Sequence, residues 1–504
     1  MTPVPPMQAP TSGVAVRMYR QGHGDCYLLA FPSGKPRPIY MLIDCGFKPG
    51  SDVHAKIGEI VEHIAASTGG HIDIVAITHE HQDHVNGIWK KGKPYFDGIG
   101  VGEAWLAWTE DPNDDVANEL RRRHKDQLLG LLGAQRRLAA AGGDRARMLE
   151  ALLTLELGDD GTDASFAAAA KDPASSTNKQ SIKLIKDKAG AAVRYIRPHG
   201  QVMTISGSEA GVRVYALGPP RDANLLADED PQGAEAFPGH GFVGAGGSFL
   251  AAAMAANEES AMASQPFMTR FGVPLTTALT DETFDPFFRE HYGVAMESPR
   301  DEDPDKEPVG NPAWRRIDHD WLGSAEDLAL ALNRGINNTS LVLAFELVRS
   351  GKVLLFAADA QRGNWRSWSA GNWMIDGRTV TTRDLLNRTV LYKVGHHGSH
   401  NATLGGTDAD DWPNLSWMAH GDYGREFTAM INAVEKWAHA QDPVWEHPLP
   451  SIKQELLRKA AGRVFQTDTD EIRKPDDVSD AEWAKFMERT NMDPLYFEYT
   501  VLDQ

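Results

Sequence analysis

The sequence of 504 residues contains little cysteine, no long apolar run and fewer basic than acidic residues. Its two cysteines, Cys26 and Cys45, exclude a fold that depends on a disulfide framework, and we expect both to be buried small apolar side chains. The first residues lack a basic segment followed by an apolar stretch, so no signal peptide is expected. No run of about 18 apolar residues predicts a membrane span. These absences favour a location in the cytoplasm and no contact with a membrane.

The shortage of positive charge limits the partners that can be expected. Lys and Arg number 51 and Asp and Glu number 70, which gives a formal net charge of −19. Tight nonspecific binding along duplex nucleic acid needs a basic surface, so this composition argues against it. A short or single-stranded nucleic acid, or a small phosphorylated molecule, stays open as a substrate because a bound metal ion can dominate the local field.

The pattern of apolar residues predicts an α/β protein with one large core or two ordinary ones. Amphipathic spacing predicts a helix over 52–66 and a helical segment over 114–157, with a break at Gly142 and Gly143. Residues 221–335 show no steady periodicity, and we interpret them as a long, partly helical insertion. Apolar and β-branched stretches bounded by Gly and Pro predict strands within residues 14–31 and 38–45 and over 71–77, 101–108, 192–196, 212–217, 340–347, 353–357 and 390–394.

The stretch THEHQDH, residues 78–84, places three histidines and two acids together. It follows directly on the predicted buried strand 71–77, and α/β proteins usually carry their chemistry at the carboxyl end of such a strand. His79 and His81 share a face of an extended chain and can bind one ion, whereas Asp83 and His84 can face a second position. Imidazole and carboxylate together suit zinc, and also manganese or iron. The alternative, a solvated polar turn, is disfavoured because such a density of histidine is rare outside metal sites.

These four residues fit the pattern H-x-H-x-D-H, which resembles the signature of the metallo-β-lactamase superfamily. Two later segments extend the resemblance. The segment VLLFAADA, residues 353–360, resembles the strand whose final aspartate bridges two metals in that family, and this aspartate is here Asp359. The segment LYKVGHHGSH, residues 391–400, resembles the family's late strand-to-histidine motif.

Within the superfamily, the motif HHGS resembles that of a narrower branch, the metallo-hydrolase domain of ComEC-type DNA-uptake proteins and their soluble relatives. One departure from this branch stands at residue 23, where His replaces the usual Gln of the motif G-Q-G-D. The matched regions run from about 14 to 108, from 190 to 220 and from 337 to 470. Five further segments share the motifs of this branch: GHGD at 22–25, LIDCG at 42–46, NNTSLVL at 337–343, HPLP at 447–450 and RVFQTD at 463–468.

The resemblance implies a four-layer α/β/β/α sandwich with the metals at one edge, between the two sheets. Residues 14–470 would form this hydrolase domain, with a helical insertion at about 112–188 and a large insertion at about 221–336. Residues 1–13 would be a flexible N-terminus and residues 471–504 a charged C-terminal helical tail. The large insertion is expected to lie beside the metals as a cover and to restrict access to small or single-stranded substrates.

The resemblance also implies roles for single residues. Asp83 would orient the attacking water or move a proton to the leaving group while it also binds metal. His396 is expected to contact substrate or support a ligand, and His447 to return to the site and touch substrate, although a surface position for His447 is an equal alternative. Asp25 and Asp44 are expected to support ligands rather than to bind metal. The predicted metal ligands are His79, His81, Asp83, His84, Asp359 and His397.

Many superfamily members supply one more histidine between the first motif and the bridging aspartate. Four histidines stand in that interval here without a convincing strand-end context: His199, His240, His291 and His319. The first metal is therefore expected to be weakly held or open to solvent.

The function predicted from these motifs is that of a dinuclear metal-dependent hydrolase. Two divalent ions, zinc first and manganese as the alternative, would lower the pKa of a shared water and supply hydroxide. Phosphodiester bonds are the leading substrate class, so the chain would be a nuclease or a small phosphodiesterase. Two alternatives stay open: an ester, lactone or thioester hydrolase with the same metals, and a non-catalytic binding module that metal ions stabilise.

Overall fold

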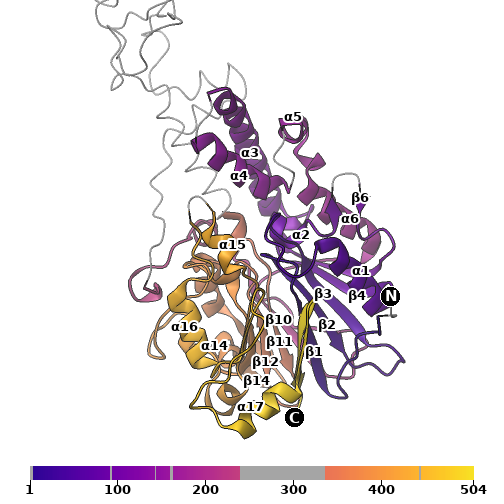
Figure 1. Cartoon of the computed structure of the whole chain (residues 1–504), viewed down its shortest axis with the longest axis vertical. Coiled ribbons are helices and arrows are strands. Elements are labelled where there is room, and N and C mark those ends of the chain that lie inside the picture. The colour runs from indigo at the N-terminus through magenta and orange to yellow at the C-terminus, as the bar shows by residue number, and fades with distance from the viewer. Residues whose placement is uncertain (1–3, 91–92, 142–143, 159–162, 239–334, 442–443) are drawn as a thin grey trace, which may run out of the picture. The chain divides into compact units, whose positions relative to one another are not determined.

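The structure is a computed structural model that describes residues 4–90, 93–141, 144–158, 163–238, 335–441 and 444–504 (Figure 1). The chain divides into two compact units. The first unit consists of Met1–His124, Leu152–Val243 and Leu332–Gln504, and the second of Lys125–Ala151 and Gly244–Ala331. The described part of the second unit is helical. Both large sheets and all described candidate site residues lie in the first unit.

Two large mixed sheets form the first unit, which confirms a mixed α/β fold. The eight-stranded sheet has the order β18 (Thr490–Asp493), β19 (Tyr496–Leu502), β1 (Gly13–Tyr19), β2 (Cys26–Phe31), β3 (Ile39–Cys45), β4 (His71–Ile77), β7 (Gly100–Ala107) and β8 (Val193–Ile196). The seven-stranded sheet has the order β17 (Val464–Gln466), β16 (Thr428–Ile431), β15 (Thr389–Lys393), β12 (Val353–Phe356), β11 (Val342–Leu347), β10 (Val212–Gly218) and β9 (Met203–Thr204).

Each sheet combines an antiparallel part with a parallel part. In the first, β1, β2 and β3 pair antiparallel, and β3, β4, β7 and β8 continue in parallel. In the second, β10, β11 and β12 pair antiparallel, and β12, β15, β16 and β17 continue in parallel. Because parallel neighbours end at the same edge of a sheet, the loops after β3 and β4 meet, and so do those after β12 and β15.

A hydrophobic core lies between the two sheets. It combines apolar side chains from the strands of both sheets in one cluster. Phe31 of the first sheet lies 6.3 Å from Phe345 of the second, and Tyr27 lies 5.4 Å from Phe356, measured between ring centroids. These aromatic pairs join side chains of the two sheets and add to the stability of their packing.

Helices cover the outer faces of both sheets (Figure 1). Helix α1 (Ile57–Thr68) buries Ile57, Ile60, Val61 and Ile64, whose spacing places them on one side of the helix. Gly69 ends this helix in the left-handed region, with φ 64°, where glycine is least strained. Helix α6 (Thr177–Ala189) packs beside α1 on the first sheet, and α13 (Arg362–Ser367), α14 (Thr382–Asn387) and α16 (Pro450–Lys459) pack on the second.

The predicted helical segment 114–157 is confirmed by α3 (Asp115–Ala141) and α4 (Asp144–Leu157), and α5 (Asp163–Lys171) and α6 follow it. The predicted break at Gly142 and Gly143 lies outside the described residues. Of the second predicted insertion, residues 221–336, the structure describes α7 (Ala223–Leu226) and neighbouring residues up to 238. Its predicted role as a cover of the site falls on residues outside the described ranges.

The two chain ends differ from the prediction. Residues 471–504 are not a helical tail, because α17 (Asp480–Glu488) is followed by β18 and β19, and β19 pairs antiparallel with β1. The buried side chains of Phe497, Tyr499 and Val501 alternate with more exposed ones, which is the period of a strand. Near the other end Met7 is 1% exposed and its N–H donates to the carbonyl of Ser67 at 2.9 Å, so this end is anchored.

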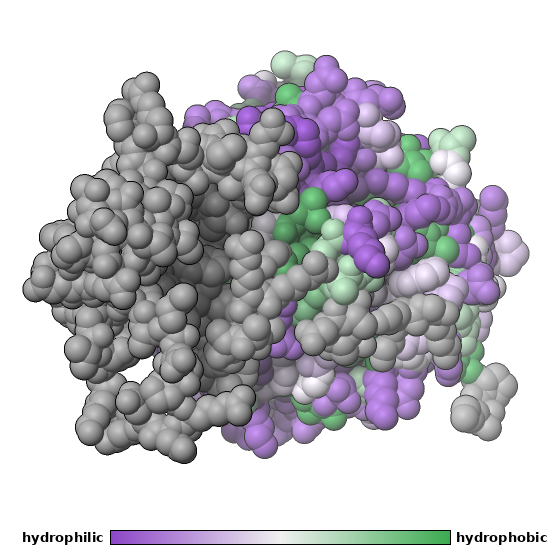
Figure 2. Space-filling view, turned by 90° about the horizontal axis from the view of Figure 1, so that it is seen from above, coloured by the Kyte–Doolittle hydropathy of each residue, from purple (hydrophilic) through white to green (hydrophobic). Residues whose placement is uncertain are grey.

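The remaining described α-helices and strands are short. They are α2 (Gln82–Val85), α15 (Glu435–His439) and two small hairpins, β5 (Trp89–Lys90) with β6 (Lys93–Pro94) and β13 (Asn372–Ile375) with β14 (Arg378–Thr381). The described surface seen in Figure 2 is mainly hydrophilic, with separate small hydrophobic areas. No helix within the described ranges carries an apolar stretch long enough to cross a bilayer.

Candidate metal centre

Three chain segments that follow parallel strands meet at one edge of the sheets. The residues 78–84 follow β4, Asp359 follows β12, and the pair His396 and His397 follows β15. The segment before β11 links the first two: the Leu341 N–H donates to the carbonyl of Thr78 at 2.9 Å, and the Ser340 hydroxyl lies 3.4 Å from His79 Nδ1 and accepts from the Asp359 N–H at 3.2 Å. The predicted ligand segments are therefore neighbours in space.

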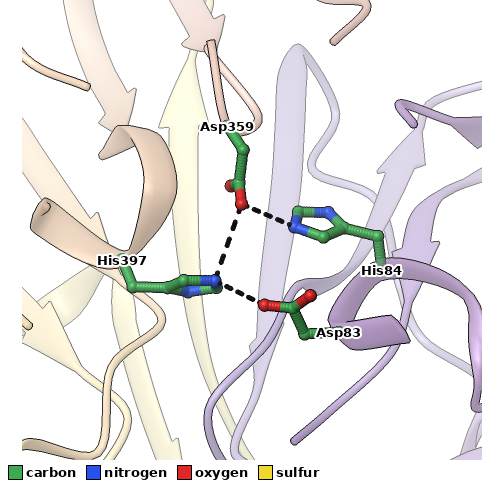
Figure 3. A group of neighbouring side chains, drawn as sticks. All are labelled: Asp83, His84, Asp359 and His397. Carbon is green, nitrogen blue, oxygen red and sulfur yellow. Dashed lines mark hydrogen bonds and ion pairs between the residues drawn. The ribbon is translucent and has the colours of Figure 1, made fainter. Parts of the chain in front are cut away.

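Four of the predicted ligands form a buried cluster, which we call the core cluster: Asp83, His84, Asp359 and His397 (Figure 3). One ligand atom from each lies within 4.8 Å of those from the other three. Asp359 Oδ2 is 3.1 Å from His84 Nε2, and Asp83 Oδ2 is 2.9 Å from His397 Nε2. Two ligand atoms of one zinc ion, each about 2.0–2.1 Å from it, lie about 3.3 Å apart in tetrahedral geometry, so these spacings suit a shared ion.

His79 and His81 form a second group beside the core cluster. His79 Nε2 is 3.1 Å from His81 Nδ1 and 3.9 Å from Asp359 Oδ2. The Thr78 hydroxyl donates its hydrogen to Asp44, so it accepts from His79 Nδ1 at 3.2 Å and leaves the Nε2 lone pair facing the other ligands. This His79–His81 pair could therefore bind one ion with Asp359 as a shared ligand.

Glu156 of α4 orients His81 and was not predicted from the sequence. Its Oε1 lies 3.2 Å from His81 Nε2, and its Oε2 lies 3.3 Å from Nε2 of His124, a residue of α3. Burial alone would raise the pKa of Glu156, but His81 and His124 lower it from 4.5 to about 2. A carboxylate can only accept, so Nε2 of His81 carries the proton and Nδ1 presents its lone pair to His79.

His84 and His397 are oriented in the same way. The Nδ1–H of His84 donates to Asp44 Oδ2 at 2.8 Å, and the Nδ1–H of His397 donates to the carbonyl of Asn432 at 2.8 Å. In both rings Nε2 is left to face the cluster. Asp44 also accepts from the N–H and the hydroxyl of Thr78, at 2.8 and 2.6 Å, so it contacts both His84 and the start of the predicted ligand segment.

Two glycines pack closely against the backbone of the loop that carries Asp83. The Asp25 N–H donates to the Asp83 carbonyl at 2.9 Å, and the Gly46 N–H donates to the Asp25 carbonyl at 2.9 Å. A Cβ atom at Gly46 would lie 2.3 Å from the Asp83 carbonyl carbon, and one at Gly24 would lie 2.7 Å from the Asp83 oxygen. The motifs GHGD and LIDCG therefore serve close packing against the ligand loop.

The late histidine pair has an unusual backbone. His396 and His397 have φ of 42° and 56°, in the left-handed region that side chains other than glycine rarely adopt. Such conformations persist only where the surroundings hold them, and they cluster at functional sites. His397 is 1% exposed, whereas the His396 side chain is 20% exposed and its Nε2 lies 3.9 Å from Asp359 Oδ2. The geometry allows His397 to bind a metal and His396 to reach a substrate.

The electrostatics of the centre favour a cation. Burial alone would lower the pKa of His84, but Asp359, Asp25 and Asp44 outweigh it and raise that pKa well above its ordinary value. The centre buries four carboxylates and two ammonium groups, which belong to Asp25, Asp44, Asp83 and Asp359 and to Lys48 and Lys393. The formal charge of these six groups together is −2. One divalent ion balances this charge, and a second leaves a positive centre that would attract an anion.

Several buried polar atoms of the core cluster make no hydrogen bond. They are Asp83 Oδ1, His84 Nε2 and Asp359 Oδ1. Each of these atoms has a charged neighbour at 3.1–3.6 Å but no hydrogen bond, so a bound ion could satisfy their unused hydrogen-bonding capacity. Imidazole nitrogens and carboxylate oxygens together match the preferences of zinc and manganese, so the residues present fit divalent metal ions.

His447 reaches the centre from the loop before α16. Its ring lies 5.4 Å from that of His396 and 6.1 Å from that of His397. The Leu449 N–H donates to the Gly398 carbonyl at 2.9 Å, which fastens this loop to the late histidine pair. The ring of His447 is half-buried and lies beside the predicted ligands, and its contact with substrate stays a prediction.

Other candidates lie elsewhere. His199 packs against Trp373, with a centroid distance of 6.0 Å, and its backbone N–H donates to the Ala216 carbonyl. His240, His291 and His319 lie outside the described residues. Cys26 and Cys45 are free and buried, as predicted, and they face each other across β2 and β3.

Glu156, His124 and the two buried lysines were missed by sequence reasoning. Lys393 lies next to the predicted strand end, with Nζ 2.5 Å from Asp25 Oδ2, and Lys48 lies 3.5 Å from Asp83 Oδ1. A lysine within the apolar stretch LYKV was a usable signal, because an isolated charge in a predicted buried strand needs a partner.

Comparisons with known proteins assign no family and no function to the chain. No family model matches the chain, and no curated protein matches its sequence.

Proposed function

We propose that the chain is a dinuclear metal-dependent hydrolase of the metallo-β-lactamase type, with the four-layer sandwich of that superfamily and with phosphodiesters as substrates. One observation carries the proposal. Asp359 Oδ2 lies within 3.9 Å of one ring nitrogen from each of four histidines: His79, His84, His396 and His397. A carboxylate oxygen that lies close to four imidazole rings is well placed to be a ligand shared by two ions.

The proposed ligands divide into two groups around Asp359. Asp83, His84 and His397 would hold one ion with it, and His79 and His81 the other. Bound divalent ions would supply Lewis acidity, which lowers the pKa of water and offsets charge on reacting oxygens. Burial alone would raise the pKa of Asp83, but Lys48 and His397 hold it well below its usual value, so Asp83 stays ionised and can orient a water molecule.

The charge of the centre supports an anionic substrate. The buried carboxylates and lysines around Asp359 and two bound divalent ions would together carry a net positive charge. A phosphodiester would neutralise part of this charge. The chain as a whole carries −19, so a short or single-stranded substrate is preferred to long duplex DNA. The ComEC-type resemblance supports the same substrate class.

Metal analysis and an activity panel test the proposal together. Protein purified with zinc or manganese should contain close to two ions per chain, measured by plasma mass spectrometry. It should hydrolyse a chromogenic bis-phosphodiester and short single-stranded oligonucleotides faster than a panel of lactones, carboxylic esters and thioesters. Preference for a lactone or thioester would overturn the substrate class, and bound metal without any turnover would leave a metal-stabilised binding module.

A further inference from the structure

His23, the residue that replaces Gln in the motif GHGD, is fully buried beside the candidate centre. Its ring lies 4.2 Å from that of His397 and 5.1 Å from that of Trp437, so it is packed between two rings. Its two nitrogens face different partners. The backbone N–H of Val434 lies 3.3 Å from Nδ1, and His447 Nδ1 lies 3.3 Å from Nε2.

The backbone group fixes the direction of both hydrogen bonds. The Val434 N–H can only donate, so His23 Nδ1 must accept and His23 must be neutral, with its proton on Nε2. This Nε2–H can then only donate to Nδ1 of His447. His447 consequently accepts at Nδ1, which leaves its own proton on Nε2. The two rings are nearly parallel, with an angle of 14° between their planes.

We propose that His23 is a positioning residue that fixes the tautomer of His447, so that His447 presents an Nε2–H donor to a non-bridging oxygen of the substrate. The inference rests on the proposed function for the identity of that substrate. Among the residues that the structure describes, none hydrogen-bonds Nε2 of His447, which stays available for a ligand. A neutral donor stabilises a charged oxygen without adding a further charge to the centre.

The same logic explains why His and Gln are alternatives at residue 23. A Gln side chain carries one acceptor and one donor, so its carbonyl can accept from Val434 and its amide can donate to His447. Leu has a similar size and offers neither group. His23→Gln should therefore keep the tautomer of His447, and His23→Leu should release it.

The test reads the tautomer directly. Zinc-loaded protein labelled with nitrogen-15 in histidine is examined by NMR, and the signals of His447 are assigned by their loss in His447→Gln. Wild type and His23→Gln should show His447 protonated at Nε2, with an unprotonated Nδ1. His23→Leu should show a mixture of tautomers with unchanged metal content. His439→Leu, the same substitution at an exposed histidine, is the control that should change nothing.

Kinetics on the phosphodiester supply a second reading. His23→Leu should lower kcat by about tenfold, the value of one hydrogen bond in the transition state, whereas His23→Gln should stay close to wild type. His447→Gln keeps a donor near the place of Nε2 and should retain more activity than His447→Asn.

The opposite tautomer in wild type would overturn the inference, even if His23→Leu fails to fold. Equal defects in His23→Gln and His23→Leu, or loss of zinc from His23→Leu alone, would overturn it as well. If no phosphodiester is hydrolysed, the proposed substrate class fails, and the NMR result still decides whether His23 sets the tautomer.

Discussion

The core cluster and the His79–His81 pair share Asp359 but differ in what supports them. His84 donates to Asp44, which lies in β3 of the first sheet, and His397 donates to Asn432, which follows β16 of the second. His81 instead depends on Glu156 of α4, a helix of the insertion that the family resemblance does not cover. The proposed metal position that the sheets build would lie next to one that needs an added helix. The two positions should therefore differ in affinity, and variants can separate them.

The largest effect is expected from Asp359→Ala, because this variant removes the ligand that both groups are proposed to share. Metal content should fall well below two ions per chain. Loss of a residue that only hydrogen-bonds to a metal ligand typically lowers activity by about 10–100-fold, and the loss of turnover in this variant should be larger. Circular dichroism should show an intact fold. Asp422→Ala removes an exposed carboxylate, with 92% of its side chain accessible, and is the control. Full activity of Asp359→Ala would remove the shared-ligand assignment.

A smaller and more selective effect is expected within the late histidine pair. His397→Ala removes a ring nitrogen 2.9 Å from Asp83 Oδ2 and should release the ion of the core cluster. His396→Ala should retain metal and lower kcat, because the His396 side chain is partly exposed and its Nε2 lies 3.9 Å from Asp359 Oδ2. Plasma mass spectrometry and steady-state kinetics on both variants check this division. Equal metal loss in the two variants would show that both residues are ligands.

The sequence predicts the candidate ligands of both groups much better than the residues that support them. The residues His79 to His84 are adjacent in the chain and follow an apolar strand, so local spacing is enough to identify them. Asp359 and His397 lie far away in sequence, and they were identified because each follows a strand in a motif of the family. The structure brings these segments together, while the metal roles of their side chains stay predictions.

Glu156 and His124 could not be found in this way. Both lie in a helical segment rich in charged residues, where periodicity shows which side chains share a face but not which of them contacts a distant loop. The C-terminal strand β19 was missed for a related reason. The charges of residues 471–489 suggested a solvated helix, although the alternation in YFEYTVL is that of a strand. Its pairing with β1 depends on contacts between the two ends of the chain.

The most informative comparison uses Glu156→Leu, which removes the acceptor of His81 without touching the core cluster. Loss of a carboxylate that orients a ligand histidine typically lowers metal affinity by about 10–100-fold. We expect a zinc titration of metal-free protein to show two phases and only one of them to weaken. Glu156→Gln keeps a carbonyl that can accept from His81 Nε2, so its effect should be smaller than that of Glu156→Leu.

His124→Gln should have the smallest effect of this series, because His124 contacts Glu156 Oε2 and not the oxygen that faces His81. Glu119→Gln, on the exposed side of the neighbouring helix α3, is the control and should leave both phases unchanged. Equal weakening of both phases in Glu156→Leu would mean that α4 supports the whole ligand loop. In that case the difference between the two proposed metal positions would have to come from their ligands alone, since the three histidines of the loop and Asp83 would then share the same support. An unchanged titration would show that His81 keeps its orientation without the helix, and the contrast between a sheet-built and a helix-dependent position would be lost.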